Sequence, residues 1–123
     1  MIALDTNAVI AYLSGASGAH VDSVDSALAS HAACLPPMVL TELLSDPKLP
    51  VNVRRLLLDL PLLSPLPGFW DRAGDLRASV IAKRHTSRLA DALIAQTCLD
   101  HDVPLLTLDR DFRHFVPAGL RLL

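Results

Sequence analysis

The residues of this chain that could do chemistry together are acids. Five of them follow apolar segments or lie near the start of predicted helices, and no histidine or cysteine pattern with metal-ligand spacing accompanies them. These residues are Asp5, Glu42, Asp91, Asp109 and Asp111. Two carboxylates about 4 Å apart repel by roughly 4 kcal/mol at an effective dielectric constant of about 20, so a cluster of them takes up protons or holds a cation. Oxygen ligands suit Mg²⁺ or Mn²⁺ and argue against Zn²⁺.

Such a cluster depends on elements that carry distant acids to one place. Short apolar segments alternate with amphipathic ones, which is typical of an α/β fold with a parallel sheet covered by helices on both faces. Strands are predicted over residues 1–5, 33–35, 62–66, 103–108 and 119–123. Helices are predicted over 7–13, 17–32, 37–45, 51–60, 68–84 and 87–102. Ser87 is the predicted N-cap of the last of these helices, and a helical turn is predicted from Asp111.

The acids fall at positions that such a sheet brings to one edge. In an open parallel sheet, ligands bind beyond the carboxyl ends of the strands. Asp5 ends the first strand, and Asp109 ends the strand over 103–108, with Asp111 further into the loop. Glu42 lies in the second turn of the helix after the second strand, and Asp91 lies in the first turn of its helix. We therefore expect these acids to meet at the same edge.

Each acid taken alone also has a local explanation. Asp5 could cap the helix that follows it, and Glu42 could belong to the exposed stripe of an amphipathic helix. Asp91 could be stabilised by the helix dipole, while Asp109 and Asp111 could form a turn or a cap. Their joint placement at one edge is what favours a metal site.

Length and composition limit the class of protein. The 123 residues suit one domain, and 51% of them are hydrophobic. No apolar run approaches the roughly 20 residues of a membrane helix, and the N-terminal segment lacks the basic and apolar regions of a signal peptide. Cys34 and Cys98 have no motif spacing and are predicted to be buried free thiols, so we expect a cytoplasmic protein. A small domain this apolar leaves apolar surface exposed, which predicts a homodimer, a protein partner or both.

Four segments together resemble the PIN domain family, and specifically the VapC ribonuclease toxins of toxin–antitoxin pairs. They are "ALDTNAVIAYL" at 3–13, "LTELL" at 40–44, "RLADALIA" at 88–95 and "LLTLDRDF" at 105–112. They occur in the family's order across nearly the whole chain. The resemblance implies a three-layer α/β/α PIN-like fold with a parallel five-stranded sheet in the order 3-2-1-4-5. It also implies a homodimer and a VapB-like antitoxin that covers the active site.

The resemblance also implies roles for individual residues. The acidic quartet of a metal-dependent endoribonuclease would be Asp5, Glu42, Asp91 and Asp109. Asp111 matches a frequent fifth acid, Thr107 matches a hydroxyl beside the last strand, and Asn7 matches the asparagine after the first aspartate. Ala90 departs from many relatives, which have a proline before the third acid of the quartet, here Asp91.

On this interpretation the substrate is RNA. One or two Mg²⁺ or Mn²⁺ ions on the carboxylates would activate a water that attacks the scissile phosphate, with no covalent enzyme intermediate. The net charge of the chain is −2, so bulk positive charge does not indicate nucleic-acid binding, and a local basic rim is expected to offset the acids. The candidates for this rim are Lys83, Arg84, Arg88, Arg110 and Arg113. Trp70 could stack on a base, although the core or an interface is the stronger expectation for it.

Two other functions fit parts of the pattern. An aspartate-dependent phosphatase on the same kind of sheet commonly has a second aspartate two residues after the first, where this chain has Asn7. A non-catalytic PIN-like module that binds RNA or protein would be signalled by the loss of acids. None of the four main acids is missing, which favours the nuclease.

Overall fold

A short parallel sheet lies at the centre of the computed structural model, which describes all 123 residues. The sheet has three strands, β1 (Ile2–Leu4), β2 (Ala33–Cys34) and β3 (Leu105–Leu106), in the order β2-β1-β3. The central strand β1 pairs in parallel with both neighbours. Every strand residue except Ile2 is buried, so the sheet lies within the hydrophobic core.

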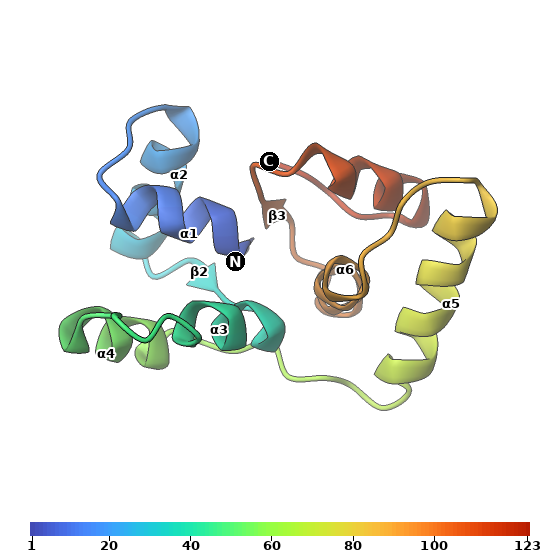
Figure 1. Cartoon of the computed structure of the whole chain (residues 1–123), viewed down its shortest axis with the longest axis horizontal. Helices are drawn as coiled ribbons and strands as arrows, with labels where there is room; N and C mark the ends of the chain where they lie inside the picture. The colour runs from blue at the N-terminus through green and yellow to red at the C-terminus, as the bar shows by residue number, and fades with distance from the viewer.

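Helices cover both sides of this sheet. They are α1 (Thr6–Leu13), α2 (Ala19–Ala29), α3 (Pro37–Leu44), α4 (Val51–Asp59), α5 (Phe69–Ala82), α6 (Leu89–His101) and the 3-10 helix η1 (Arg110–Ala118). In Figure 1, α1 and α2 lie on one side of the strands, and α5 and α6 lie on the other. This cover explains why the strands are apolar on both faces. None of these helices combines the length and the apolar character that crossing a membrane requires.

Helix α6 is buried along most of its length. Residues 92–98 are all buried, and the helix packs against α3, α5 and η1. A helix that is buried all round lies in the core and has little freedom to rotate. Its first turn, which carries Asp91, is therefore held in one direction by core packing. Cys98 of α6 and Cys34 of β2 are both buried and free, as the sequence predicts.

The five-stranded sheet expected from the sequence is present only in part. The segments predicted as the third and fifth strands each contribute one parallel bridge, from Leu62 to Leu35 and from Leu122 to Leu105. The two bridges extend the sheet on the outer side of β2 and on the outer side of β3. These are the flanks where the order 3-2-1-4-5 would place further strands. Pro61 has no backbone N–H to donate, which limits the pairing of the third segment. The five-strand order stays a prediction.

Other expectations from the sequence are wrong in specific places. The helix predicted over 17–32 ends earlier, because His31 adopts a left-handed conformation with φ 55°. Arg88, not Ser87, is the N-cap of α6, and the Ser87 hydroxyl is buried without a hydrogen-bond partner. Of the two places expected for Trp70, its 66% exposure excludes the core and leaves an interface.

Candidate active site

Asp5 lies directly after β1 and is the N-cap of α1. Its Oδ1 accepts a hydrogen bond from the backbone N–H of Thr6 at 2.8 Å, and its Oδ2 accepts one from the hydroxyl of Thr107 at 2.6 Å. The residue is only 5% exposed. Each carboxylate oxygen has a second lone pair, so the capping role does not prevent Asp5 from binding a cation.

The loop after β3 is tied to the same edge by two polar side chains. Asn7 accepts a hydrogen bond through Oδ1 from the backbone N–H of Leu108 at 3.0 Å. The hydroxyl of Thr107 accepts one from the backbone N–H of Asp109, also at 3.0 Å. Asp109 is the N-cap of η1, where its Oδ1 accepts from the backbone N–H of Asp111 at 2.9 Å. These bonds join the loops after β1 and β3 and hold Asp109 at the edge where β1 ends.

Glu42 reaches this edge from α3. Its Oε1 accepts a hydrogen bond from the hydroxyl of Thr6 at 2.8 Å, across 36 residues of sequence. Because Glu42 is exposed, this bond is the contact that orients its side chain. Sequence reasoning missed Thr6, although its position between Asp5 and Asn7 could have indicated it.

Asp91 shows that negative charges converge at this edge. Desolvation by burial is the largest cause that raises its pKa from 3.8 to about 6. The charges of Asp109 and Asp5 contribute to this increase, Arg88 opposes it, and Glu42 makes a smaller contribution. Carboxylates from four separate segments therefore act on one another, as the strand-end argument predicts.

The pKa of Asp5 is shifted in the same direction. Burial is the main cause that raises it above 3.8, and the hydrogen bonds from Thr107 and Thr6 oppose the increase. The charges of Glu42 and Asp109 add to the increase. A buried carboxylate that is ionised beside like charges is costly, so protonation or a nearby cation stabilises this arrangement.

This group of side chains offers only oxygen ligands to a cation. That donor set fits Mg²⁺ or Mn²⁺ by its chemistry. No three acidic, histidine or cysteine side chains already lie at metal-binding distance from one point. Glu42 is exposed and Asp91 is half-buried, so both side chains have room to turn toward a shared ion.

Of the remaining predicted residues, only Arg88 interacts with an acid of the site. Asp111 is exposed and is not among the groups that shift the pKa of Asp5 or Asp91. Arg88 is close enough to Asp91 to lower its pKa. The ion pairs of the structure, Arg72–Asp100 and Arg121–Asp102, include none of the predicted basic residues. These exposed, unpaired residues are Lys83, Arg84, Arg88, Arg110 and Arg113.

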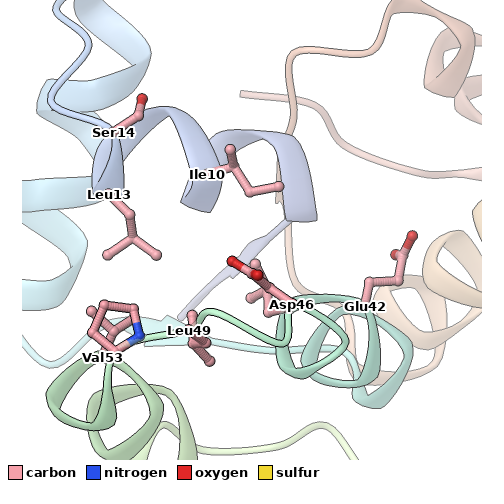
Figure 2. Close-up of a pocket in the computed structure, with 9 residues that line it drawn as sticks. Ile10, Leu13, Ser14, Glu42, Asp46, Leu49 and Val53 are labelled. Atoms are coloured by element: carbon pink, nitrogen blue, oxygen red, sulfur yellow. The ribbon is translucent and has the colours of Figure 1, made fainter.

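An apolar groove of about 340 Å³ adjoins the site at Glu42. Figure 2 shows Ile10 and Leu13 of α1 facing Leu49 and Val53, with Glu42 at the margin. Ile10 is 53% exposed, which is unusual for a side chain of its type. The groove therefore offers apolar surface for a partner directly beside the acidic edge.

The parallel sheet and the acids near its carboxyl edge define an α/β domain with an acidic candidate site. The model of the PIN domain family matches residues 2–116 of the chain. The chain therefore belongs to the PIN domain family. No curated protein matches the chain.

Solved structures share this fold. A chain in the crystal structure of VapBC2 from Rickettsia felis, bound to a promoter DNA fragment, has a TM-score of 0.73 at 20% identity and covers 100% of this chain and 98% of that one. A chain of a toxin–antitoxin complex from Klebsiella pneumoniae has a TM-score of 0.73 at 21% identity, with coverage of 100% and 96%. For VapBC-1 from nontypeable Haemophilus influenzae the TM-score is 0.74 at 16% identity, with coverage of 100% and 97%. At these identities the likeness shows the fold alone.

Proposed function

We propose that this protein is a Mg²⁺- or Mn²⁺-dependent endoribonuclease that acts as the toxin of a type II, VapBC-like toxin–antitoxin pair. The observation that carries the proposal is the pKa of Asp91, which burial and the charges of Asp109 and Asp5 raise to about 6. Arg88 is the only cation among the groups that shift this pKa. An acidic site with so little internal compensation favours a cation from outside.

The side chains of this site have separate roles in the proposed reaction. The four carboxylates that would hold the cation are those of Asp5, Glu42, Asp91 and Asp109. When bound, the cation would lower the pKa of a water and neutralise charge that develops on the phosphate. Thr107 orients Asp5, and Thr6 orients Glu42, through their hydroxyls. Asn7 holds the loop that carries the last aspartate of the quartet.

Exposed basic residues would hold the RNA backbone. We assign this role to four of them, Arg84, Arg88, Arg110 and Arg113. All four are exposed and form no ion pair, so their guanidinium groups are available for phosphate. Because the net charge of the chain is −2, RNA binding would depend on these local charges.

We assign the groove beside Glu42 to the antitoxin. The similar structure from Klebsiella pneumoniae is a toxin–antitoxin complex, and the one from Rickettsia felis is VapBC2. The groove has apolar walls, with Glu42 and Asp46 among its lining residues. It suits a segment that combines apolar side chains with a basic one, and such a segment would cover the acidic edge.

A homodimer is also part of the proposal. Trp70 and Leu89 are 66% and 62% exposed, which leaves large apolar side chains in water. A second copy of the chain would bury surface of this kind. Light scattering on the purified protein measures the particle mass, and a monomer at all concentrations contradicts the dimer.

Cleavage of RNA tests the catalytic part of the proposal. Purified protein is incubated with bacterial RNA in Mg²⁺, in Mn²⁺ or in EDTA, and the 5′ ends of the fragments are sequenced. We expect cleavage with either metal and none in EDTA. Asp5→Asn should lower the rate by more than about 100-fold, since loss of outer-shell partners of a metal site alone costs 10–100-fold. The control is Asp22→Asn, an exposed aspartate of α2, which should cleave like wild type.

Cation binding is tested separately by thermal unfolding. A cation that binds only the folded protein raises the melting temperature. We expect Mn²⁺ to raise it for the wild type and for Asp22→Asn, but not for Asp91→Asn. An equal increase in all three proteins, or cleavage that persists in EDTA, contradicts a metal site at this edge.

The groove assignment is tested with the product of the neighbouring gene. Ile10→Glu places a charge on the groove wall and should abolish co-purification of the antitoxin. Val51→Glu is the control, because Val51 is 72% exposed and lies outside the groove. Retained co-purification with Ile10→Glu would place the antitoxin on another surface.

A further inference from the structure

Two histidines that lie among basic residues in the sequence stack on each other and have no role in the site described above. The ring centroids of His85 and His114 are 4.0 Å apart, and their planes differ by 16°. His85 lies in the loop between α5 and α6, six residues before Asp91, and His114 lies on η1, which begins after Asp109. The stack therefore joins the two segments that carry these acids.

The backbone of His85 is held by the end of α5. Arg84 has a left-handed conformation, with φ 63°. Its N–H donates to the carbonyl of Ile81 at 2.9 Å, and the N–H of His85 donates to the carbonyl of Val80 at 3.2 Å. This pair of bonds is a Schellman motif, which fixes the residue after the left-handed one.

His114 is held from the other side by η1. Phe112 and Phe115 are 0% and 2% exposed, so they anchor η1 in the core. His114 is half-buried, whereas His85 is exposed. One face of the His85 ring lies against His114, and no other aromatic ring contacts it. The ring of His85 is thus supported from within and open to solvent.

The charge around the stack is positive, in contrast to the chain as a whole. Residues 83–88 contain three basic residues and no acid, and residues 110–114 contain two arginines and one aspartate. None of these five basic residues forms an ion pair. A polyanion would therefore find both unpaired cations and a planar ring at this place.

We propose that His85, supported by His114, is a stacking platform for one base of single-stranded RNA, with the surrounding basic side chains on the adjoining phosphates. The inference rests on the proposed function in taking RNA as the ligand, and it adds the residue that contacts a base. Bases of single-stranded RNA stack on aromatic side chains, histidine included. A ring that is already held in place loses little conformational freedom on binding.

Binding of two homopolymers tests the platform, because stacking depends on the base and phosphate contacts do not. Labelled oligo(A) and oligo(U) of about 12 nucleotides are titrated by fluorescence anisotropy in Ca²⁺, a hard cation that accepts carboxylate ligands. Gels confirm that the RNA stays intact. We expect wild-type protein to prefer oligo(A), and His85→Ala to weaken oligo(A) binding by about tenfold and oligo(U) binding by no more than about threefold.

Three further variants separate stacking from other effects. His85→Tyr should keep the preference for oligo(A), because it retains an aromatic ring. Arg113→Gln should weaken both ligands by the same factor. His20→Ala, on α2, should bind both ligands like wild type. Thermal unfolding confirms that each variant is folded.

The inference is overturned if His85→Ala binds both ligands like wild type, if it weakens both by one factor, or if wild-type protein binds neither. Its failure is distinguishable from failure of the proposed function. Protein that cleaves RNA while His85→Ala keeps the wild-type preference has no platform at His85. Protein that loses its preference with His85→Ala, yet cleaves no RNA, has the platform and is not a nuclease.

Discussion

The two ends of helix α6 carry aspartates whose pKa values are shifted in opposite directions. Asp91, in the first turn, has a pKa raised to about 6, first by desolvation and then by Asp109 and Asp5. The pKa of Asp100, near the last turn, is lowered below 3.8, mainly by its hydrogen bonds with Arg72. Both residues belong to one helix, so the difference comes from what each end faces.

The helix dipole predicts the opposite order. It stabilises an acid at the N-terminus and disfavours one at the C-terminus, by about 0.3–1 kcal/mol. Local partners override it at both ends. Arg72 donates to both oxygens of Asp100, at 3.0 and 2.6 Å, and Gln96 donates to Oδ1 at 2.8 Å. The fold thus supplies a counter-charge to an aspartate that holds α5 to α6. Asp91 forms no such ion pair, and Arg88 only partly offsets the increase in its pKa, which distinguishes the end that we assign to catalysis.

The largest expected effect separates the two ends by activity. Asp91→Asn should lower the rate of RNA cleavage by more than about 100-fold, because it removes a proposed ligand of the cation. Asp100→Asn should change the rate by less than about twofold, since its contacts are with Arg72 and Gln96. Single-turnover cleavage rates at saturating protein measure both variants. Equal losses at the two ends would remove the functional distinction between them.

The second effect is on stability. Asp91→Asn, which should lose activity, should gain stability. The folded pKa of Asp91 lies above its unfolded value, so the folded protein binds more protons between about pH 4 and pH 6. Its free energy of unfolding therefore falls as the pH rises through this range. The full shift corresponds to about 3 kcal/mol, which solvent screening of a half-buried group reduces to about 1–2 kcal/mol. Asp91→Asn should be more stable than wild type by that amount near neutral pH.

Urea unfolding at about pH 7.5 and about pH 4 measures this gain and its loss. The variant should be the more stable protein at the higher pH and equal to wild type at the lower one. A variant that is less stable at both values would mean that Asp91 stabilises the fold. The comparison between the two ends of α6 would then fail.

A third, smaller effect concerns the other end of the helix. The folded pKa of Asp100 is lowered, so its contribution is present above the unfolded pKa and is lost as the pH falls below about 4. Asp100→Asn should therefore lower the free energy of unfolding by about 1 kcal/mol near neutral pH. Asp75→Asn, on the exposed face of α5, is the matched control and should unfold like wild type. A stabilised Asp100→Asn would show that Arg72 does not compensate the charge.

That the acids lie near one another could be predicted from the sequence, because the prediction depends only on the direction of the strands. Asp5 and Asp109 follow apolar runs, and the carboxyl ends of parallel strands share one edge. The number of strands in the sheet was harder to predict from the sequence. The segments around Leu62 and Leu122 look like strands, yet each makes a single bridge, because pairing depends on neighbours far along the chain and on residues such as Pro61.

Contacts between side chains that are far apart in the sequence could not be predicted, because they produce no local sequence pattern. The bond between Thr6 and Glu42 spans 36 residues, and the stacked histidines belong to separate segments. Local propensity also gave a wrong answer where a tertiary contact competes with it. Ser87 is a favourable N-cap by residue type, but Arg77 donates to its carbonyl at 3.0 Å and the hydroxyl is buried.

The smallest expected effect is on stability and concerns Ser87, just before the start of α6. The hydroxyl of Ser87 is buried without a partner, four residues before Asp91. An unsatisfied buried hydroxyl is costly, and its removal leaves only a small void. We therefore expect Ser87→Ala to raise the free energy of unfolding by about 0.5 kcal/mol. Urea unfolding of this variant beside Asp91→Asn would show two separate sources of instability at the first turn of α6. A loss of stability in Ser87→Ala would instead mean that the hydroxyl has a partner, such as an ordered water, and that Asp91 alone distinguishes this end of the helix.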